Sequence, residues 1–267
     1  MTQPELHFYD FGEGVKAFSS TRKGGCSEGN YAEFNINHYC GDSEDAIQTN
    51  RTSLCHYLGI SEDRLIMPHQ VHQTEIVAID EAFLRLSAEG QKARLEGVDA
   101  LMTNVKGVCI GVSTADCIPV LIYDRVKRVS CAIHAGWRGT VKRIVEKAVE
   151  TMISVYGSRP SDLLVQIGPG IHLESFEVGD EVYEAFAREG FEMETISQRF
   201  PAADGSSIEK WHIDLPMCNL QQLRSKGIPQ SQISVSEVCT FQQSDIYFSA
   251  RRLGINSGRI FTGILML

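Results

Sequence analysis

The stretch from Gly107 to Gly136 constrains the fold more than any other part of the chain. It reads GVCIGVSTADCIPVLIYDRVKRVSCAIHAG, in which apolar and β-branched residues dominate and DRVK has the composition of a turn. We expect strands in GVCIGVSTAD, IPVLIYD and RVSCAIHAG, the last two forming a hairpin. This hairpin runs directly into the glycine-containing turn HAGWRGT.

A helical pattern follows that turn. Apolar residues recur at steps of three and four, which predicts an amphipathic helix starting near Thr140. We also expect a helix from Ser43 to Gly59, one through VGDEVYEAFAREG, and one that is capped by Asp214 and includes NLQQLRSKG. RLIMPHQVHQTEIVAID should be mostly extended, and LLVQIGPGI should be a buried strand that ends in a turn.

These strands and helices mix without a steady β–α–β alternation, which indicates an α+β fold rather than a doubly wound parallel sheet. No linker, repeat or low-complexity stretch divides the 267 residues, so we expect one domain over 1–267. A chain of this size buries roughly three quarters of its unfolded surface. Its core therefore needs no metal or disulfide, and a bound metal would serve chemistry first.

The charge balance argues against nucleic acid as a partner. The formal net charge is −9, the sequence pI is about 5.4, and no block of Lys and Arg is present to displace counterions from phosphates. No apolar stretch is long enough for a membrane span, and the N-terminus does not resemble a signal peptide. Eight dispersed cysteines without a C-x-x-C pair are expected to be reduced thiols, which favours the cytoplasm.

Three side chains are candidate metal ligands: His72 in PHQVH, Cys117 in TADCIP and His134 in IHAGWRGT. Two imidazoles and one thiolate suit a catalytic zinc site, which leaves a fourth position for water or substrate. The three residues are far apart in the chain, so only folding could bring them together. The alternative is a strand cysteine packed as an apolar residue and two hydrogen-bonded histidines.

His69 competes with His72 for the same role. Residues three apart in an extended strand point to opposite faces, so one of the two at most should enter the site unless Pro68 breaks the strand. The residues alone do not choose between them.

The turn HAGWRGT could also bind an anion. Gly136 and Gly139 allow close approach of the backbone, and the N–H groups of a helix start favour phosphate or carboxylate. Arg138 could add a bidentate charged donor. The alternative is a tight turn with Trp137 in the core and Arg138 in solvent. TRKGG is a second glycine turn with two cations, and it matches neither the Walker A nor the dinucleotide pattern.

Seven segments together resemble the laccase-domain, or polyphenol-oxidase-like, family, which is also described as purine nucleoside phosphorylases with adenosine deaminase activity. They are STRKGGCSEGNYAEFNIN, HQVH, VDALMTN, VSTADCIPVLIYD, AIHAGWRGT, IGPGI and FSARRLGINSGRI, in order from about Ser19 to Gly263. The resemblance implies a cytoplasmic enzyme with mixed sheets in an α/β/β/α layered sandwich, similar to a cysteine-dependent toxin catalytic domain. Gly170 and Ala250 depart from the family pattern, which has Cys and an aromatic residue or His there.

The resemblance also implies the ligand set. The family's metal ligands fall on His72, Cys117 and His134, and the metal would be Zn²⁺ or alternatively Cu²⁺. This resemblance is the reason to prefer His72 over His69.

The implied reaction is phosphate-dependent cleavage of adenosine, inosine, guanosine or methylthioadenosine. We expect Arg138 and Arg22 to neutralise phosphate, and Gln70 and Asn35 to hydrogen-bond the nucleoside. Beside the ligand Cys117, Asp116 could act as the acid or base, or could orient a ligand imidazole.

Three alternatives remain at this stage. The first is a copper polyphenol oxidase, which would need many imidazole ligands. This chain has only eight His and no H-x-H pair. A Cys117 thiolate with His134 as base could cleave an amide, for example in editing peptidoglycan precursors. A metal-stabilised interaction module would need a fourth protein ligand, for which the sequence offers no convincing candidate.

Overall fold

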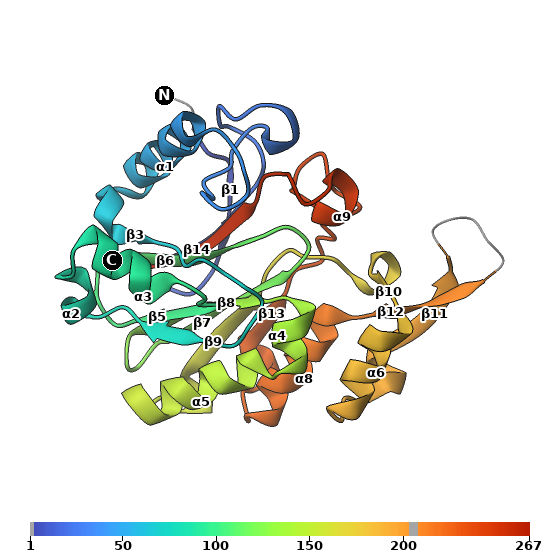
Figure 1. Cartoon of the computed structure of the whole chain (residues 1–267). Coiled ribbons are helices and arrows are strands. Elements are labelled where there is room, and N and C mark those ends of the chain that lie inside the picture. The colour runs from blue at the N-terminus through green and yellow to red at the C-terminus, as the bar shows by residue number, and fades with distance from the viewer. Residues whose placement is uncertain (1–2, 203–207) are drawn as a thin grey trace.

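The computed structural model describes residues 3–202 and 208–267. Two stacked β-sheets form its centre, and helices cover both outer faces (Figure 1). The five-stranded sheet has the order β1 (Leu6–Tyr9), β2 (Val15–Ser20), β14 (Ile260–Met266), β6 (Cys109–Thr114) and β3 (Leu65–Ile66). The six-stranded sheet has the order β13 (Ile233–Val235), β9 (Leu163–Ile167), β7 (Ile118–Asp124), β8 (Val129–Ala135), β5 (Ala100–Thr103) and β4 (Ile76–Ala78).

Both large sheets contain parallel and antiparallel pairs. In the five-stranded sheet, β3 runs parallel to β6 while the other pairs are antiparallel. In the six-stranded sheet, the edge pairs β4–β5 and β13–β9 are parallel and the central pairs are antiparallel. The expected α+β class and the mixed-sheet α/β/β/α layering are therefore confirmed.

The helices are unequal in length. Those of eight residues or more are α1 (Glu44–Leu58), α3 (Ala88–Leu95), α5 (Ile144–Tyr156), α6 (Asp180–Arg188) and α8 (Leu215–Ser225). The short ones are α2 (Glu81–Leu84), α4 (Trp137–Val141), α7 (Met193–Ile196) and α9 (Ala250–Leu253). None of the helices in residues 3–202 and 208–267 has the length and apolar character needed to cross a membrane.

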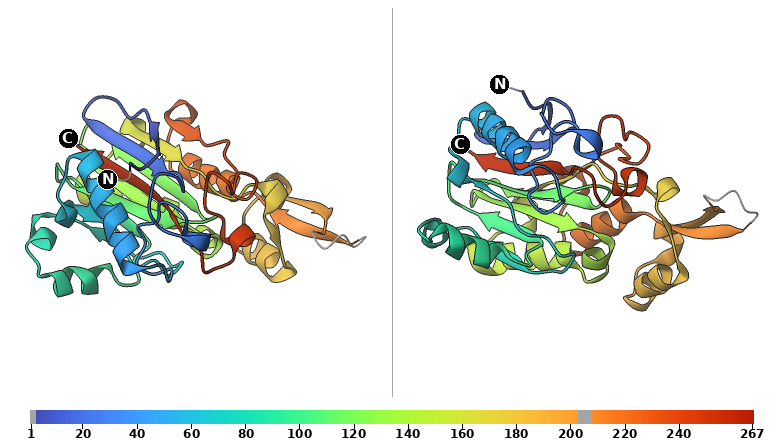
Figure 2. Two further views of the ribbon diagram at one scale, coloured as in Figure 1. Left: turned by 90° about the horizontal axis from the view of Figure 1, so that it is seen from above. Right: turned by 45° about the horizontal axis from the view of Figure 1, so that its top comes forward.

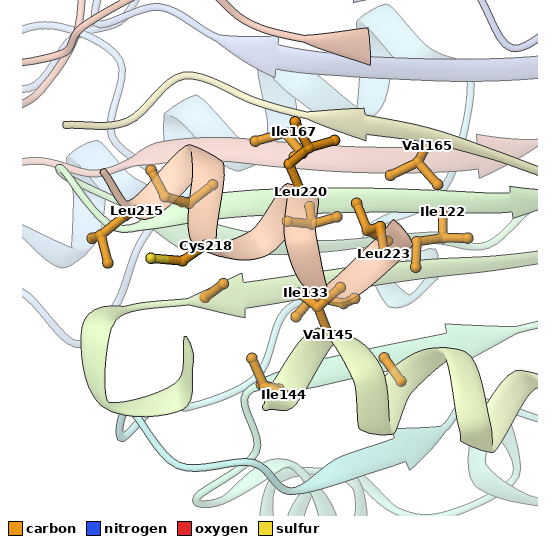
Figure 3. Packing of buried hydrophobic residues seen from close by; sticks show 14 of the residues in the cluster. Ile122, Ile133, Ile144, Val145, Val165, Ile167, Leu215, Cys218, Leu220 and Leu223 are labelled. Atoms are coloured by element: carbon orange, nitrogen blue, oxygen red, sulfur yellow. The ribbon is translucent and has the colours of Figure 1, made fainter. Parts of the chain in front are cut away.

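The alternation of side chains along β7 and β8 builds two core layers. Val120 and Ile122 face α5 and α8, whereas Leu121 and Tyr123 face the five-stranded sheet. Figure 3 shows the helix side, where Val145 and Leu223 meet the sheet. A third cluster packs α1 against the outer face of the five-stranded sheet.

A small third sheet extends from one end of the molecule (Figure 2). It has the order β10 (Glu177–Val178), β12 (Glu209–Ile213) and β11 (Ser197–Pro201), and it lies beside α6. Its buried residues Val178 and Ile213 belong to the same apolar cluster as the six-stranded sheet. The extension is thus continuous with the main core.

Several expected elements are confirmed. The helix α1 follows Ser43 and ends at Gly59, which adopts the left-handed conformation with φ 76°. The Asp214 carboxylate accepts a hydrogen bond from the Met217 N–H at the start of α8. The hairpin β7–β8 turns at the DRVK segment. None of the eight cysteines, all of which lie within the described residues, forms a disulfide.

Two expectations about local structure were wrong. The helix expected to start near Thr140 is two helices, because Arg143 adopts φ 62° between α4 and α5. The Arg143 guanidinium lies 3.7 Å from the Phe191 ring centroid and donates to the Glu189 carbonyl, and these distant contacts hold the break. The segment 64–80 is a strand only at β3 and β4, because the chain between them leaves one sheet for the other.

Candidate functional site

Two of the segments in which the chain passes from one large sheet to the other form the site. Residues 67–75 lead from β3 to β4, and residues 115–117 lead from β6 to β7. His72 lies on the first crossover and Cys117 on the second. His134 lies near the end of β8, paired with Pro119 of β7, so the hairpin brings it beside Cys117.

The first crossover is held by a buried carboxylate. The backbone N–H groups of Val71, His72 and Gln73 all donate to Asp99, at 3.3, 3.0 and 2.7 Å. His72 has φ 62°, a conformation that a non-glycine residue adopts at a cost. The hydrogen bonds to Asp99 stabilise that conformation and fix the direction of the His72 side chain.

The same carboxylate orients His134. Its Nδ1 lies 2.7 Å from Asp99 Oδ1, and both side chains are buried. Since Nδ1 faces the carboxylate, Nε2 is the nitrogen left for a metal or a thiol.

The functional atoms of His72, Cys117 and His134 converge. One ligand atom from each residue lies within 4.8 Å of the others. The two imidazole rings are 4.8 Å apart at an interplanar angle of 74°. Gly136 makes room for them, because a Cβ there would lie 2.9 Å from His72 Cδ2 and 3.0 Å from Cys117 Sγ.

The electrostatics favour a thiolate in this cluster. Burial alone raises the pKa of the Cys117 thiol, but the adjacent His134 and His72 outweigh burial and lower the pKa to about 6. Burial lowers the pKa of His134, while Cys117 and Asp99 raise it to about 9. A thiolate is the form of cysteine that binds metals and attacks electrophiles.

The cluster opens into a cavity of about 480 Å³. This volume is within the range of small-molecule sites. Besides the three clustered side chains, the lining consists of Asn37, Tyr39, Cys40, His69, Gln70, Ser113, Thr114, Ala115, Ala250, Ile255, Asn256 and Arg259.

The donor set fits a catalytic metal site. Two imidazoles and a thiolate are the ligands that zinc and copper prefer, and this cluster offers three of them with one side facing the cavity. Within residues 3–202 and 208–267, this is the one group of three or more His, Cys, Asp or Glu side chains arranged closely enough to hold a metal ion.

His69 lies at the cavity but outside the cluster. Its Nδ1 is 2.7 Å from Glu96 Oε1, and its ring stacks on that of Tyr39 at 4.0 Å. The segment is not a strand here, so the argument from alternating faces does not apply; the contact with Glu96 holds His69 at the cavity wall.

Two of the expected substrate-binding residues use their amides within the protein. Gln70 lines the cavity, but its side chain exchanges hydrogen bonds with the backbone N–H and C=O of Ser113, both at 2.8 Å. Asn35 is fully buried away from the lining and donates to Asp42 while accepting from the Arg259 N–H. Asn37, two residues further on, lines the cavity instead.

The cavity lining does not include Arg22, Arg138 or Asp116, which were expected to act on phosphate or as an acid or base. Arg22 donates to the carbonyls of Ala32 and Ser244, both at 2.7 Å. Arg138 is exposed on α4 and stacks on Trp137. The Asp116 carboxylate accepts from Thr240 Oγ1 and from the backbone N–H of Arg251, both at 2.7 Å.

Two residues at the site, Asp99 and Thr114, were not predicted from the sequence. Asp99 lies in VDALMTN, where a lone acidic residue before an apolar strand is the signal that could have marked it. Thr114 is 1 % exposed and lines the cavity, and its hydroxyl has no hydrogen-bond partner. A buried polar group without a partner indicates a position for a ligand atom or water.

The family model described as "Multi-copper polyphenol oxidoreductase laccase" matches residues 16–267. The chain belongs to this family. Membership in this laccase-like family confirms the resemblance found in the seven sequence segments.

Two similar proteins bear the names of nucleoside enzymes. A "Purine nucleoside phosphorylase" of Bacteroides thetaiotaomicron is 44 % identical over 94 % of this chain and 92 % of that protein. "Adenosine deaminase RL5" from an unknown prokaryotic organism is 43 % identical over 97 % of this chain and 98 % of that protein. Nearly the whole length is shared in both cases.

Two solved structures have a fold similar to that of this chain. The chain is similar to a Bacillus licheniformis hypothetical protein, YfiH, with a TM-score of 0.89 and 27 % identity, covering 99 % of this chain and 97 % of that one. It is also similar to YlmD from Geobacillus stearothermophilus, with a TM-score of 0.84 and 30 % identity, covering 95 % and 92 %.

Proposed function

We propose that this chain is a metal-dependent purine nucleoside phosphorylase that also deaminates adenosine. The observation that carries the proposal is the convergence of His72, Cys117 and His134 at one wall of a nucleoside-sized cavity. The names of the relatives that are 44 % and 43 % identical support both activities. The proposed substrates are phosphate with adenosine, inosine, guanosine or methylthioadenosine, and the eight free cysteines favour a reducing compartment such as the cytoplasm.

Phosphorolysis places clear demands on such a site. The bond between ribose C1′ and the purine nitrogen breaks, a phosphate oxygen bonds to C1′, and the bonding electrons leave with the purine, which takes up a proton. Positive charge develops on the sugar and negative charge on the purine. The products are the free base and ribose 1-phosphate.

We infer that His72, Cys117 and His134 hold a zinc or copper ion at the cavity wall. When bound, the ion supplies Lewis-acid activation of the attacking phosphate or water. In deamination, water attacks the purine C6 and ammonia leaves. The nucleobase deaminase signature, in which H-x-E is followed by P-C-x-x-C, is absent because the sequence has no P-C-x-x-C, so this activity would use a differently built site.

The cavity lining supports a revised set of nucleoside contacts. We propose that Asn37 and the unpartnered hydroxyl of Thr114 hydrogen-bond the nucleoside, in place of Asn35. Gln70 acts indirectly, because its amide fixes the Ser113 backbone in the same wall. Arg138, exposed on α4 two residues after Gly136, remains the proposed phosphate partner, whereas Arg22 is held by carbonyls elsewhere.

The test is the variant Cys117→Ala. It should lose bound metal and lower phosphorolysis at least 10³-fold, because it removes one of three ligands. Metal content and the products from a nucleoside panel, with and without phosphate, measure both effects. Cys26→Ala, at an exposed thiol that belongs neither to the cluster nor to the cavity lining, is the matched control and should behave as wild type. Full turnover by metal-free protein would overturn the proposal.

A second candidate function rests on the lowered pKa of Cys117. The pairing of Cys117 with the buried His134 is also the arrangement of a thiol nucleophile and its base, which suits an amidohydrolase acting on peptidoglycan precursors. An activity of this kind would survive EDTA and be abolished by iodoacetamide.

The third candidate, copper-dependent phenol oxidation, has weaker support. Multicopper oxidases hold an oxygen-reducing copper cluster in addition to a single copper centre. The described residues contain one cluster with metal-binding geometry. Turnover of nucleosides under anaerobic conditions separates the phosphorylase from an oxidase.

A further inference from the structure

Asp99 hydrogen-bonds to both of the proposed histidine ligands without being a proposed ligand itself. It is fully buried just before β5, and its carboxylate faces His134 on one side and the crossover 71–73 on the other. The two histidines come from segments that are far apart in the sequence. Their relative position therefore depends on what this carboxylate holds.

The carboxylate is saturated with donors. Oδ1 meets His134 Nδ1 at 2.7 Å and the His72 N–H at 3.0 Å, and Oδ2 meets the N–H groups of Gln73 at 2.7 Å and Val71 at 3.3 Å. A carboxylate has about four acceptor positions, so each one has a donor. Three successive amides that converge on an anion form a backbone nest.

The backbone of Asp99 strengthens the same connections. Its carbonyl accepts from the His134 N–H at 2.8 Å, and its N–H donates to the Glu75 carbonyl at 3.0 Å, at the end of the crossover. Asp99 thus binds both the strand that carries His134 and the segment that carries His72. The Asn side chain could not replace it, since its NH₂ group would face N–H donors.

We propose that Asp99 is the positioning residue of the metal centre, which fixes His72 through its backbone and His134 through its ring and so determines the metal affinity. This inference rests on the proposed metal site. With Nδ1 directed at Asp99, His134 presents Nε2 to the site in one orientation. His72 is held at φ 62° by the amide bonds, so both ligands are in place before an ion arrives.

The test compares Asp99→Asn with Asp124→Asn. Asp124 is also a fully buried carboxylate, and its Oδ1 accepts from the N–H groups of Val126 and Lys127, both at 2.8 Å. It lies at the turn of the β7–β8 hairpin, whose opposite end carries Cys117 and His134. Asp124→Asn therefore controls for the general cost of removing a buried carboxylate that binds amides.

Zinc affinity is measured by competition with a fluorescent chelator. Asp99→Asn should bind Zn²⁺ 10- to 100-fold more weakly, the range found for lost outer-sphere partners, whereas Asp124→Asn should stay within twofold of wild type. In the zinc-loaded protein, the His134 Nδ1 proton should exchange slowly in NMR spectra, and Asp99→Asn should abolish that protection. A folded Asp99→Asn protein with wild-type zinc affinity would overturn the inference.

A second variant covers the case in which Asp99→Asn does not fold. Val71→Pro removes one of the three amide donors at an exposed position, and it should weaken zinc binding several-fold. Unchanged affinity in Val71→Pro would then overturn the inference. Zinc binding is measured without nucleosides, so wild-type protein that binds zinc but performs no phosphorolysis would overturn the proposed function alone.

Discussion

The absence of a side chain at Gly136 leaves room for the neighbouring side chains of His72 and Cys117. Its φ is −67°, so alanine would meet no backbone strain there. The methyl group would instead press on His72 Cδ2 and Cys117 Sγ, at 2.9 and 3.0 Å. The glycine is therefore required by the neighbouring side chains rather than by its own conformation.

We predict that Gly136→Ala weakens zinc binding at least tenfold, or about 1.4 kcal/mol. The reason is that His72 and Cys117 must move apart to admit the methyl group. Isothermal titration calorimetry with Zn²⁺ measures the change. Gly90→Ala in the exposed helix α3 is the control and should leave zinc affinity unchanged. Equal affinity in both variants would contradict the steric account.

At the residue scale, the sequence indicated which side chains have metal-binding chemistry, but it did not indicate which residues hydrogen-bond one another around the site. His72, Cys117 and His134 could be named as candidates because thiolate and imidazole chemistry is visible in single residues, but only the family resemblance favoured His72 over His69. The choice between Asn35 and Asn37 was not visible, because it depends on Asp42 and Arg259, which occupy the Asn35 amide from distant positions. The role of Asp99 was hidden for the same reason, as its four donors come from two other segments.

Among the elements, the connection between β6 and β7 has the most direct bearing on the site. Asp116 in this connection has φ 82°, and its carboxylate binds Thr240 and the N–H of Arg251 in α9. These bonds hold the connection, and with it Cys117, against the C-terminal part of the chain. We therefore expect the carboxylate to act on the position of Cys117 rather than on a substrate in the cavity.

We predict that Asp116→Asn keeps kcat within about threefold of wild type. Its oxygen can accept from the Arg251 N–H, while its NH₂ group donates to Thr240 Oγ1, so both contacts survive. Asp116→Ala loses both and should lower the free energy of unfolding by about 1–3 kcal/mol. Steady-state kinetics and urea unfolding measure these effects. A 10²- to 10⁴-fold loss of kcat in Asp116→Asn would instead identify an acid or base.

Periodicity predicted where most elements lie but not where they are interrupted. The helix pattern after HAGWRGT is correct from Ile144 onward, since Ile144, Val145 and Val149 are buried as expected. The break at Arg143 depends on Phe191 and the Glu189 carbonyl, which no local pattern contains. In the same way, residues 71–73 lie in a segment that looks extended, but they donate their amide hydrogen bonds to the Asp99 side chain instead of a neighbouring strand.

At the scale of the whole molecule, the cluster lies where two of the crossovers between the large sheets meet, the one from β3 to β4 and the one from β6 to β7. A metal ion held by His72, Cys117 and His134 would connect these crossovers to β8, and such ligands do not converge in the unfolded chain. Metal binding should therefore stabilise the folded state by mass action.

We predict that Zn²⁺ at 100 times its Kd stabilises the metal-free protein by about 2.7 kcal/mol. For a chain of this size, that corresponds to a rise in Tm of roughly 5 °C or more. Differential scanning calorimetry after EDTA treatment, with and without added zinc, measures the shift. Cys117→Ala should show no rise, and an equal rise in that variant would place the stabilising ion elsewhere.

The position of β14 has a consequence for biosynthesis. This strand lies between β2 and β6, although the ribosome makes it after every other described strand. Until residue 266 has left the exit tunnel, β2 and β6 lack their common neighbour and expose unpaired edges. Because β6 leads directly to Cys117, we expect the cluster of His72, Cys117 and His134 to form only after this last strand has been synthesised.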